Sequence, residues 1–138
     1  MSSECIFCKI VAGELPASRV YEDEHTLAFM DIGPVMKGHV LVIPKSHFDP
    51  ITATPDETLA SLISTVRKVA GAVMRRLEAD GVTITQANGA AAGQVVPHVH
   101  FHVIPRFDTD TVPRGWKPGN YESTDEMNAY AEKIRAGL

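Results

Sequence analysis

The chain has 138 residues, 44% of them hydrophobic, and a formal net charge of −4 with a sequence pI of about 5.8. These totals predict one globular domain with an ordinary core, and the acidic balance argues against nucleic acid as a partner. Residues 1–4 are polar and no apolar run is long enough for a membrane span, so we expect a cytoplasmic protein without a signal peptide or a membrane partner.

The first third of the chain predicts one short helix and three strands. Apolar residues at helical spacing indicate a helix over residues 5–13. Two strand-like stretches, 19–22 and 26–31, flank a polar turn and predict a β-hairpin. The apolar run 39–44, rich in β-branched residues, is typical of a central strand.

One long helix is predicted in the middle of the chain. Thr54 is expected at the N-cap, Pro55 at the first helical position, and Glu57 would complete a capping box with Thr54. Apolar residues follow this start at helical spacing, and Gly81 is expected to close the helix near Asp80.

Two further strands are predicted at 82–87 and 97–104, separated by a loop of small residues. Because that loop is too short for a helical crossover, the two strands should pair antiparallel. The order of strands, one long helix and more strands indicates an α+β fold with an antiparallel sheet of about five strands.

The C-terminal part is expected to be irregular over 106–121 and helical over 125–135, with Ser123 or Thr124 as the cap. Trp116 lies in the irregular stretch, where it packs either on the domain or on a partner.

His98, His100 and His102 stand at every second position of the predicted strand 97–104. In a strand they would line one face, while the intervening apolar residues enter a core. A row of imidazoles fills an apolar interior poorly, because each ring brings two nitrogens that need partners. The pattern therefore favours chemistry: metal binding, nucleophilic attack or proton transfer.

The loop before the histidines carries two glycine-containing pairs, Asn88-Gly89 and Gly93-Gln94, around three alanines. Glycines let the backbone approach a ligand closely, and free amides there can bind an anion. A phosphate beside an imidazole array is one interpretation, in which one ring attacks phosphorus and its neighbours hold charge and protons. A polar hairpin loop is the alternative.

Cys5 and Cys8 are the two cysteines of the chain, in the arrangement Cys-x-x-Cys. A disulfide between residues this close would restrain little chain and is disfavoured in a reducing cytosol. The residues alone leave two interpretations of the cysteine pair: half of a metal site or a redox pair.

Several motifs together resemble the histidine-triad family of nucleotide hydrolases and transferases. Residues 98–104 are similar to its signature His-φ-His-φ-His-φ-φ, where φ is apolar. Residues 29–32 and 38–47, Asn88 and the Gly93-Gln94 pair also stand at the family's spacing. The similarity covers about residues 5–107 and is greater to the small bacterial, Hint-like branch than to the Fhit-like branch.

The resemblance implies a histidine-triad domain over 1–107 and a C-terminal extension, 108–138, packed on the same domain. It also implies a homodimer in which the sheets and long helices of two protomers join.

The implied activity is cleavage of nucleoside 5′-phosphoramidates or related purine nucleotide conjugates at the α-phosphate. His100 would attack phosphorus and form a nucleotidyl-histidine, which water then hydrolyses. His102 would contact the phosphate oxygens, and His98 and His39 would complete the catalytic cluster.

The resemblance also implies the remaining nucleotide contacts. Asp31 resembles the carboxylate that binds both ribose hydroxyls. Residues that resemble the apolar slot for the base are Phe7, Ile10, Phe29 and Ile32. Residues that resemble the surroundings of the α-phosphate are Asn88, Gly93 and Gln94. Val95 departs from the family, since relatives that act on phosphoramidates often carry Ser or Thr there to help deliver a proton to the leaving amine.

A structural zinc ion held by Cys5, Cys8, His47 and His98 is implied as well, with no cofactor required for the chemistry itself. Four protein ligands close such a site to water and substrate. Three functional alternatives stay open: a nucleotide-binding protein with little turnover, a zinc hydrolase whose histidines activate a metal-bound water, and a dinucleoside polyphosphate hydrolase.

Overall fold

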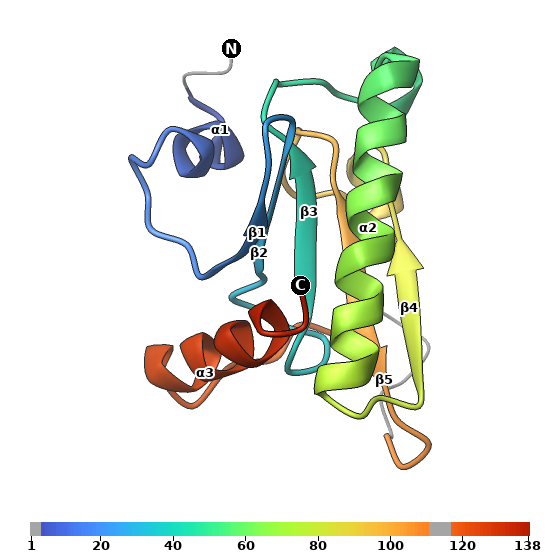
Figure 1. Ribbon diagram of the computed structural model, residues 1–138. Coiled ribbons are helices and arrows are strands. Elements are labelled where there is room, and N and C mark those ends of the chain that lie inside the picture. The colour runs from blue at the N-terminus through green and yellow to red at the C-terminus, as the bar shows by residue number, and fades with distance from the viewer. Residues whose placement is uncertain (1–3, 111–116) are drawn as a thin grey trace.

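The structure, a computed structural model, describes residues 4–110 and 117–138, so the prediction for Trp116 lies outside the described residues. These residues form an antiparallel sheet of five strands, as the sequence predicts, and the strand order is β1-β2-β3-β5-β4 (Figure 1). The strands are β1 (Arg19–Glu22), β2 (Thr26–Met30), β3 (Val40–Pro44), β4 (Gly81–Thr85) and β5 (Phe101–Arg106). The helices are α1 (Ile6–Val11), α2 (Asp56–Arg76) and α3 (Thr124–Arg135), with short 3-10 turns at Ile51–Ala53 and Ala90–Ala92.

The sheet separates two apolar layers, because side chains of a strand alternate between its faces. Figure 1 shows α2 along one face and α1 on the other side of β1 and β2. On the α2 side, Ala28, Met30, Val40 and Val42 pack against the long helix. On the α1 side, the buried residues are Cys5, Phe7, Ile10, Leu27, Phe29, Leu41 and Ile43. His102 stands opposite Leu41 in the β3–β5 register, so its side chain belongs to the α1 side.

The histidine strand begins at Phe101, not at Pro97 as predicted. Upstream of Phe101 the chain bends, and the Val99 amide donates to the carbonyl of Phe48 in the loop after β3. The apolar residues between the histidines still enter a core as predicted, since Val99, Phe101 and Val103 are buried on the α2 side. The preceding strand, β4, ends at Thr85 opposite His102, two residues earlier than predicted.

The predicted cap of the long helix is wrong. The helix begins at Asp56 after Pro55, and the Thr54 hydroxyl donates to the carbonyl of Pro50. Its C-terminal end also comes earlier than predicted: Glu78 adopts φ +53° just after Leu77, and the Ala79 amide donates to the Met74 carbonyl. This is a Schellman-type ending, so Gly81 is free to begin β4.

The C-terminal helix agrees with the sequence. The Ser123 hydroxyl accepts from the Glu126 amide and caps α3. Ala131 and Ile134 of this helix are buried in the core that α2 forms with the sheet. Among the described residues, no helix is both long and apolar enough to cross a membrane.

Candidate functional site

Three histidine side chains meet where β3 and β5 lie side by side. His39 immediately precedes β3, His102 lies in β5, and His100 stands one residue before β5. The Nε2 atom of His39 lies 2.9 Å from Nδ1 of His102, and the rings of His100 and His102 are 4.9 Å apart. The fold therefore places three imidazoles within one cluster.

One backbone amide determines which ring nitrogen carries the hydrogen in His39 and, through His39, in His102. The amide of Val35 donates to Nδ1 of His39 at 3.1 Å, so that nitrogen has no hydrogen. Neutral His39 then carries its hydrogen on Nε2 and donates it to Nδ1 of His102. His102 in turn carries its hydrogen on Nε2, which makes this atom a donor.

His100 is the opposite tautomer, with its hydrogen on Nδ1. Its Nδ1 lies 2.7 Å from the carbonyl oxygen of His98, which can only accept, so Nδ1 carries the hydrogen. The lone pair is therefore on Nε2. The ring is buried and lies edge-on to Phe7, with 5.1 Å between ring centroids. A neutral, oriented imidazole with an available lone pair has the form of a nucleophile.

Burial keeps these rings neutral. It is the main cause that lowers the pKa of His39 to about 3 and that of His102 to about 3. Burial also lowers the pKa of His100, although its hydrogen bond to the His98 carbonyl and the charges of Asp31 and Asp49 act in the opposite direction. The cluster is thus uncharged at neutral pH.

Asp31 lies beside this cluster. One carboxylate oxygen accepts from the Gly33 amide at 2.8 Å, and the other lies 3.5 Å from Nε2 of His39. Ligand atoms of Asp31, His39 and His102 all lie within 4.8 Å of one another. A metal there would need the lone pair of His39 Nε2, but the Val35 amide places the hydrogen on that nitrogen. The geometry therefore disfavours a catalytic metal at this position.

Three of the residues expected to form the base slot lie together. Phe7, Ile10 and Phe29 are buried in the α1-side core, with the rings of Phe7 and Phe29 5.4 Å apart and edge-on. The fourth, Ile32, is 79% exposed, and Val95 is 90% exposed. Both of these apolar side chains therefore face solvent.

The loop before the histidines is held by its own amide side chains. Oδ1 of Asn88 accepts from the Ile51 amide at 2.8 Å. Oε1 of Gln94 accepts from the Gly89 amide at 2.7 Å, and Nε2 of Gln94 donates to Asp49 and to the carbonyl of Val96. Gly93, at φ +95°, ends the 3-10 turn inside this loop. Both hydrogens of the Gln94 amide are thus engaged within the protein.

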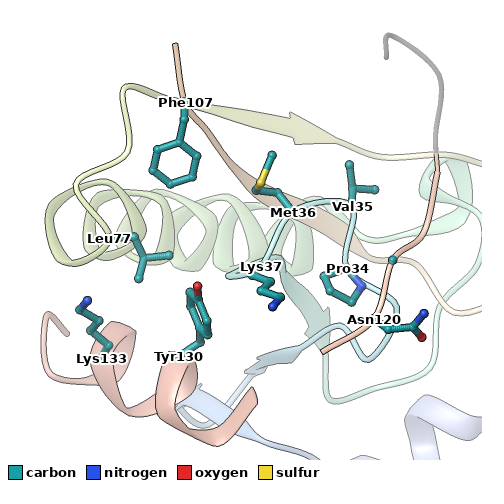
Figure 2. Close-up of a pocket in the computed structure, with 10 residues that line it drawn as sticks. Pro34, Val35, Met36, Lys37, Leu77, Phe107, Asn120, Tyr130 and Lys133 are labelled. Atoms are coloured by element: carbon teal, nitrogen blue, oxygen red, sulfur yellow. The ribbon is translucent and has the colours of Figure 1, made fainter. Parts of the chain in front are cut away.

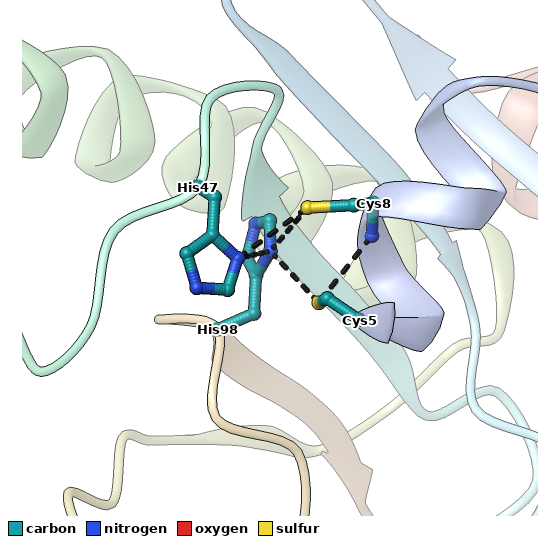
Figure 3. A group of neighbouring side chains, drawn as sticks. All are labelled: Cys5, Cys8, His47 and His98. Carbon is teal, nitrogen blue, oxygen red and sulfur yellow. Dashed lines mark hydrogen bonds between the residues drawn. The ribbon is translucent and has the colours of Figure 1, made fainter. Parts of the chain in front are cut away.

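The predicted metal ligands converge on the α1 side (Figure 3). Sγ of Cys5 lies 3.4 Å from Nδ1 of His98, and Sγ of Cys8 lies 3.4 Å from Nδ1 of His47. The two Nδ1 atoms are 3.2 Å apart. A tetrahedral zinc ion with bonds of about 2.0–2.3 Å separates its ligand atoms by roughly 3.3–3.8 Å, so this spacing fits zinc.

The orientation of His98 also fits a metal. Its Nε2 lies 2.9 Å from the Pro44 carbonyl, so Nε2 carries the hydrogen and the Nδ1 lone pair faces the cysteines. Burial lowers the pKa of His98 to about 4, which keeps that lone pair free of a proton. Burial and the neighbouring Cys5 raise the pKa of the Cys8 thiol to about 11, so two thiolates here need a cation between them.

Asp49 and the amide of Val35 are site groups that the sequence reasoning missed. Asp49 holds Gln94, and its charge acts on His98 and His100. Asp49 lies two residues after His47 and directly before Pro50. No local sequence pattern predicts its contact with Gln94.

A cavity of about 460 Å³ opens between the loop before β3, the end of α2 and α3 (Figure 2). The loop Pro34–Lys37 forms one wall, and Leu77, Phe107 and Tyr130 contribute apolar surface. No histidine is among its lining residues, so this cavity is not the candidate site.

Comparisons with known proteins identify a family and several relatives. The model of the HIT domain matches residues 12–109. A HIT-like protein of Methanocaldococcus jannaschii is 53% identical over 77% of this chain and 81% of its own length. An adenosine 5′-monophosphoramidase of Candida albicans is 37% identical over 99% of this chain and 92% of its own length.

Among solved structures, a zinc-bound histidine triad family protein of Mycobacterium smegmatis superposes with a TM-score of 0.89. It is 38% identical, over 99% of this chain and 94% of that one. With a family model that covers most of the chain, relatives aligned along almost its whole length and the same fold, this chain belongs to the histidine triad (HIT) family.

Proposed function

We propose that this protein hydrolyses adenosine 5′-phosphoramidates or related purine nucleotide conjugates at the α-phosphate, through a covalent nucleotidyl intermediate on His100. The observation that carries the proposal is the tautomer of His100. Its Nδ1–H donates to the His98 carbonyl, while Nε2 keeps its lone pair. The adenosine 5′-monophosphoramidase activity named for the Candida albicans relative supports the choice of substrate.

The proposed reaction has two displacements. The Nε2 atom of His100 attacks the α-phosphorus while the bond from phosphorus to the leaving nitrogen breaks, and the amine takes a proton from water because residue 95 has no hydroxyl. The ring then carries a positive charge, and its Nδ1–H still donates to the His98 carbonyl. Water attacks phosphorus next while the bond to Nε2 breaks, and the electron pair of that bond returns to Nε2 as its lone pair. The proton lost by the attacking water neutralises the hydroxide left by the first step, and the nucleotide leaves.

The neighbouring residues would hold the nucleotide. The Nε2–H of His102 is a donor for a phosphate oxygen, because His39 occupies its other nitrogen. The carboxylate oxygen of Asp31 that does not bind Gly33 is suited to a ribose hydroxyl. Phe7 and Phe29 supply an apolar wall next to His100 for the base.

We also propose that the two cysteines, His47 and His98 hold a structural zinc ion. When bound, zinc would cross-link the N-terminal segment to the loop after β3 and to the segment before β5. His98 then serves two sites, with its side chain in the metal cluster and its carbonyl on His100.

Trapping the intermediate tests the proposed chemistry. Wild-type protein is mixed with a fluorogenic adenosine 5′-phosphoramidate, quenched within milliseconds to seconds, and digested for peptide mass spectrometry. We expect an adenylate on the peptide that contains His100. Rapid turnover without an adduct at any time would instead indicate direct attack by water on the substrate.

A homodimer is the proposed assembly. β4 is an edge strand of the sheet, and Ile84 on it is 45% exposed. Ile63 and Met74 on α2 are also exposed, so the helix and the adjacent edge strand present apolar side chains. Sedimentation equilibrium should give twice the chain mass of 15.0 kDa, and Ile84→Lys should shift the protein toward the monomer. A wild-type monomer at micromolar concentration would contradict this proposal.

A further inference from the structure

Asp49 is a half-buried carboxylate that none of the family motifs explains. It lies in the loop between β3 and α2, two residues after His47. Its Oδ1 accepts from Nε2 of Gln94 at 2.7 Å. Among the described residues, none of the ion pairs includes Asp49. Its hydrogen bond to Gln94 is therefore the contact that its role must explain.

The hydrogen bond to Asp49 orients the side-chain amide of Gln94. An aspartate oxygen and the Val96 carbonyl can only accept, so the amino group of Gln94 must face both of them. The amide oxygen of Gln94 then faces Gly89, whose amide donates to it at 2.7 Å. Asp49 therefore determines the orientation of the amide that closes the loop of residues 89–94.

Asp49 also joins two loops that are distant in sequence. β3 and β4 are both antiparallel to β5, so the loops that follow them leave the sheet at the same end (Figure 1). Besides the contact between Asp49 and Gln94, the Ile51 amide donates to Asn88, and the Val99 amide donates to the Phe48 carbonyl. These contacts tie the loop of residues 89–94 and the segment that carries His98 and His100 to the same loop after β3.

We propose that Asp49 is a positioning residue: it orients the side-chain amide of Gln94 and so closes the loop of residues 89–94. This inference rests on the proposed hydrolysis through His100, and the closure of the loop can be tested without turnover.

Two substitutions at Asp49 test this role. Asp49→Asn keeps an acceptor oxygen for Gln94, whereas Asp49→Ala removes it. We expect kcat to fall about tenfold in Asp49→Ala and to stay within about twofold of the wild type in Asp49→Asn. Asp23→Asn, at a half-buried carboxylate in the β1–β2 turn, is the matched control and should leave kcat unchanged.

Amide hydrogen exchange of Gly89, measured by NMR, tests the loop independently of activity. We expect faster exchange at Gly89 in Asp49→Ala and wild-type protection in Asp49→Asn. Unchanged Gly89 protection in Asp49→Ala would overturn the proposed loop closure, even if the wild type had no phosphoramidase activity. Wild-type kcat in Asp49→Ala, or an equal loss of kcat in Asp49→Asn, would overturn the positioning role in an active enzyme. An inactive wild type would refute the proposed hydrolysis, and Gly89 exchange alone would then decide the loop closure.

Discussion

Replacement of His100 by alanine should lower kcat/KM for an adenosine 5′-phosphoramidate by at least about a thousandfold. The variant loses the nitrogen that forms the bond to phosphorus, and no neighbouring ring can replace it. His39 and His102 donate and accept between themselves, and His98 faces the cysteines. AMP affinity should change much less, because the apolar wall, Asp31 and His102 remain. Fluorescence assays of amine release and calorimetry of AMP binding measure the two effects.

His25→Ala is the matched control for this substitution. His25 is an exposed histidine in the turn between β1 and β2, and we expect its variant to keep wild-type turnover. Far-ultraviolet circular dichroism of His100→Ala should match the wild type, which separates loss of chemistry from loss of fold. Substantial residual turnover in a folded His100→Ala protein would refute the covalent mechanism.

Removal of the proposed zinc ion should lower thermal stability far more than it lowers turnover at room temperature. Without the metal, the buried Nδ1 of His98 and the thiols lose the cation that lies between them. We expect about one zinc ion per wild-type chain. In the double variant Cys5→Ser/Cys8→Ser we expect almost none, together with a fall in Tm of about 10 °C. Elemental analysis and differential scanning calorimetry measure these quantities.

A chelator provides the control for the zinc prediction. It should lower the Tm of the wild type toward that of the double variant and leave the Tm of the double variant itself unchanged. Turnover that persists in the stripped wild type at room temperature would agree with a structural ion. Equal zinc content in the wild type and the double variant would refute the assignment of these ligands.

Local patterns predicted the elements that depend on local forces. A polar turn between two short strand-like stretches predicted β2, and a continuous apolar run rich in β-branched residues predicted β3. Helical spacing predicted α2, and the Ser123 hydroxyl caps α3, one of the two caps expected. The errors occur where distant partners compete for a group. Thr54 has the composition of a cap, but the Pro50 carbonyl takes its hydroxyl. Residues 97–100 have a strand pattern, but Val99 pairs with Phe48 of another loop.

For the site, local patterns were sufficient to predict the candidate groups: alternating histidines, a Cys-x-x-Cys pair and an aspartate before a central strand. These are properties of contiguous chain, and two-residue periodicity is sufficient to place His100 and His102 near each other. Only the tertiary structure decided the chemical state of each ring. The Val35 amide, the His98 carbonyl and the Pro44 carbonyl place the ring hydrogens, and Asp49 reaches Gln94 across two loops. Hydrogen-bond partners of this kind are set by the packing of distant segments, which no local pattern encodes.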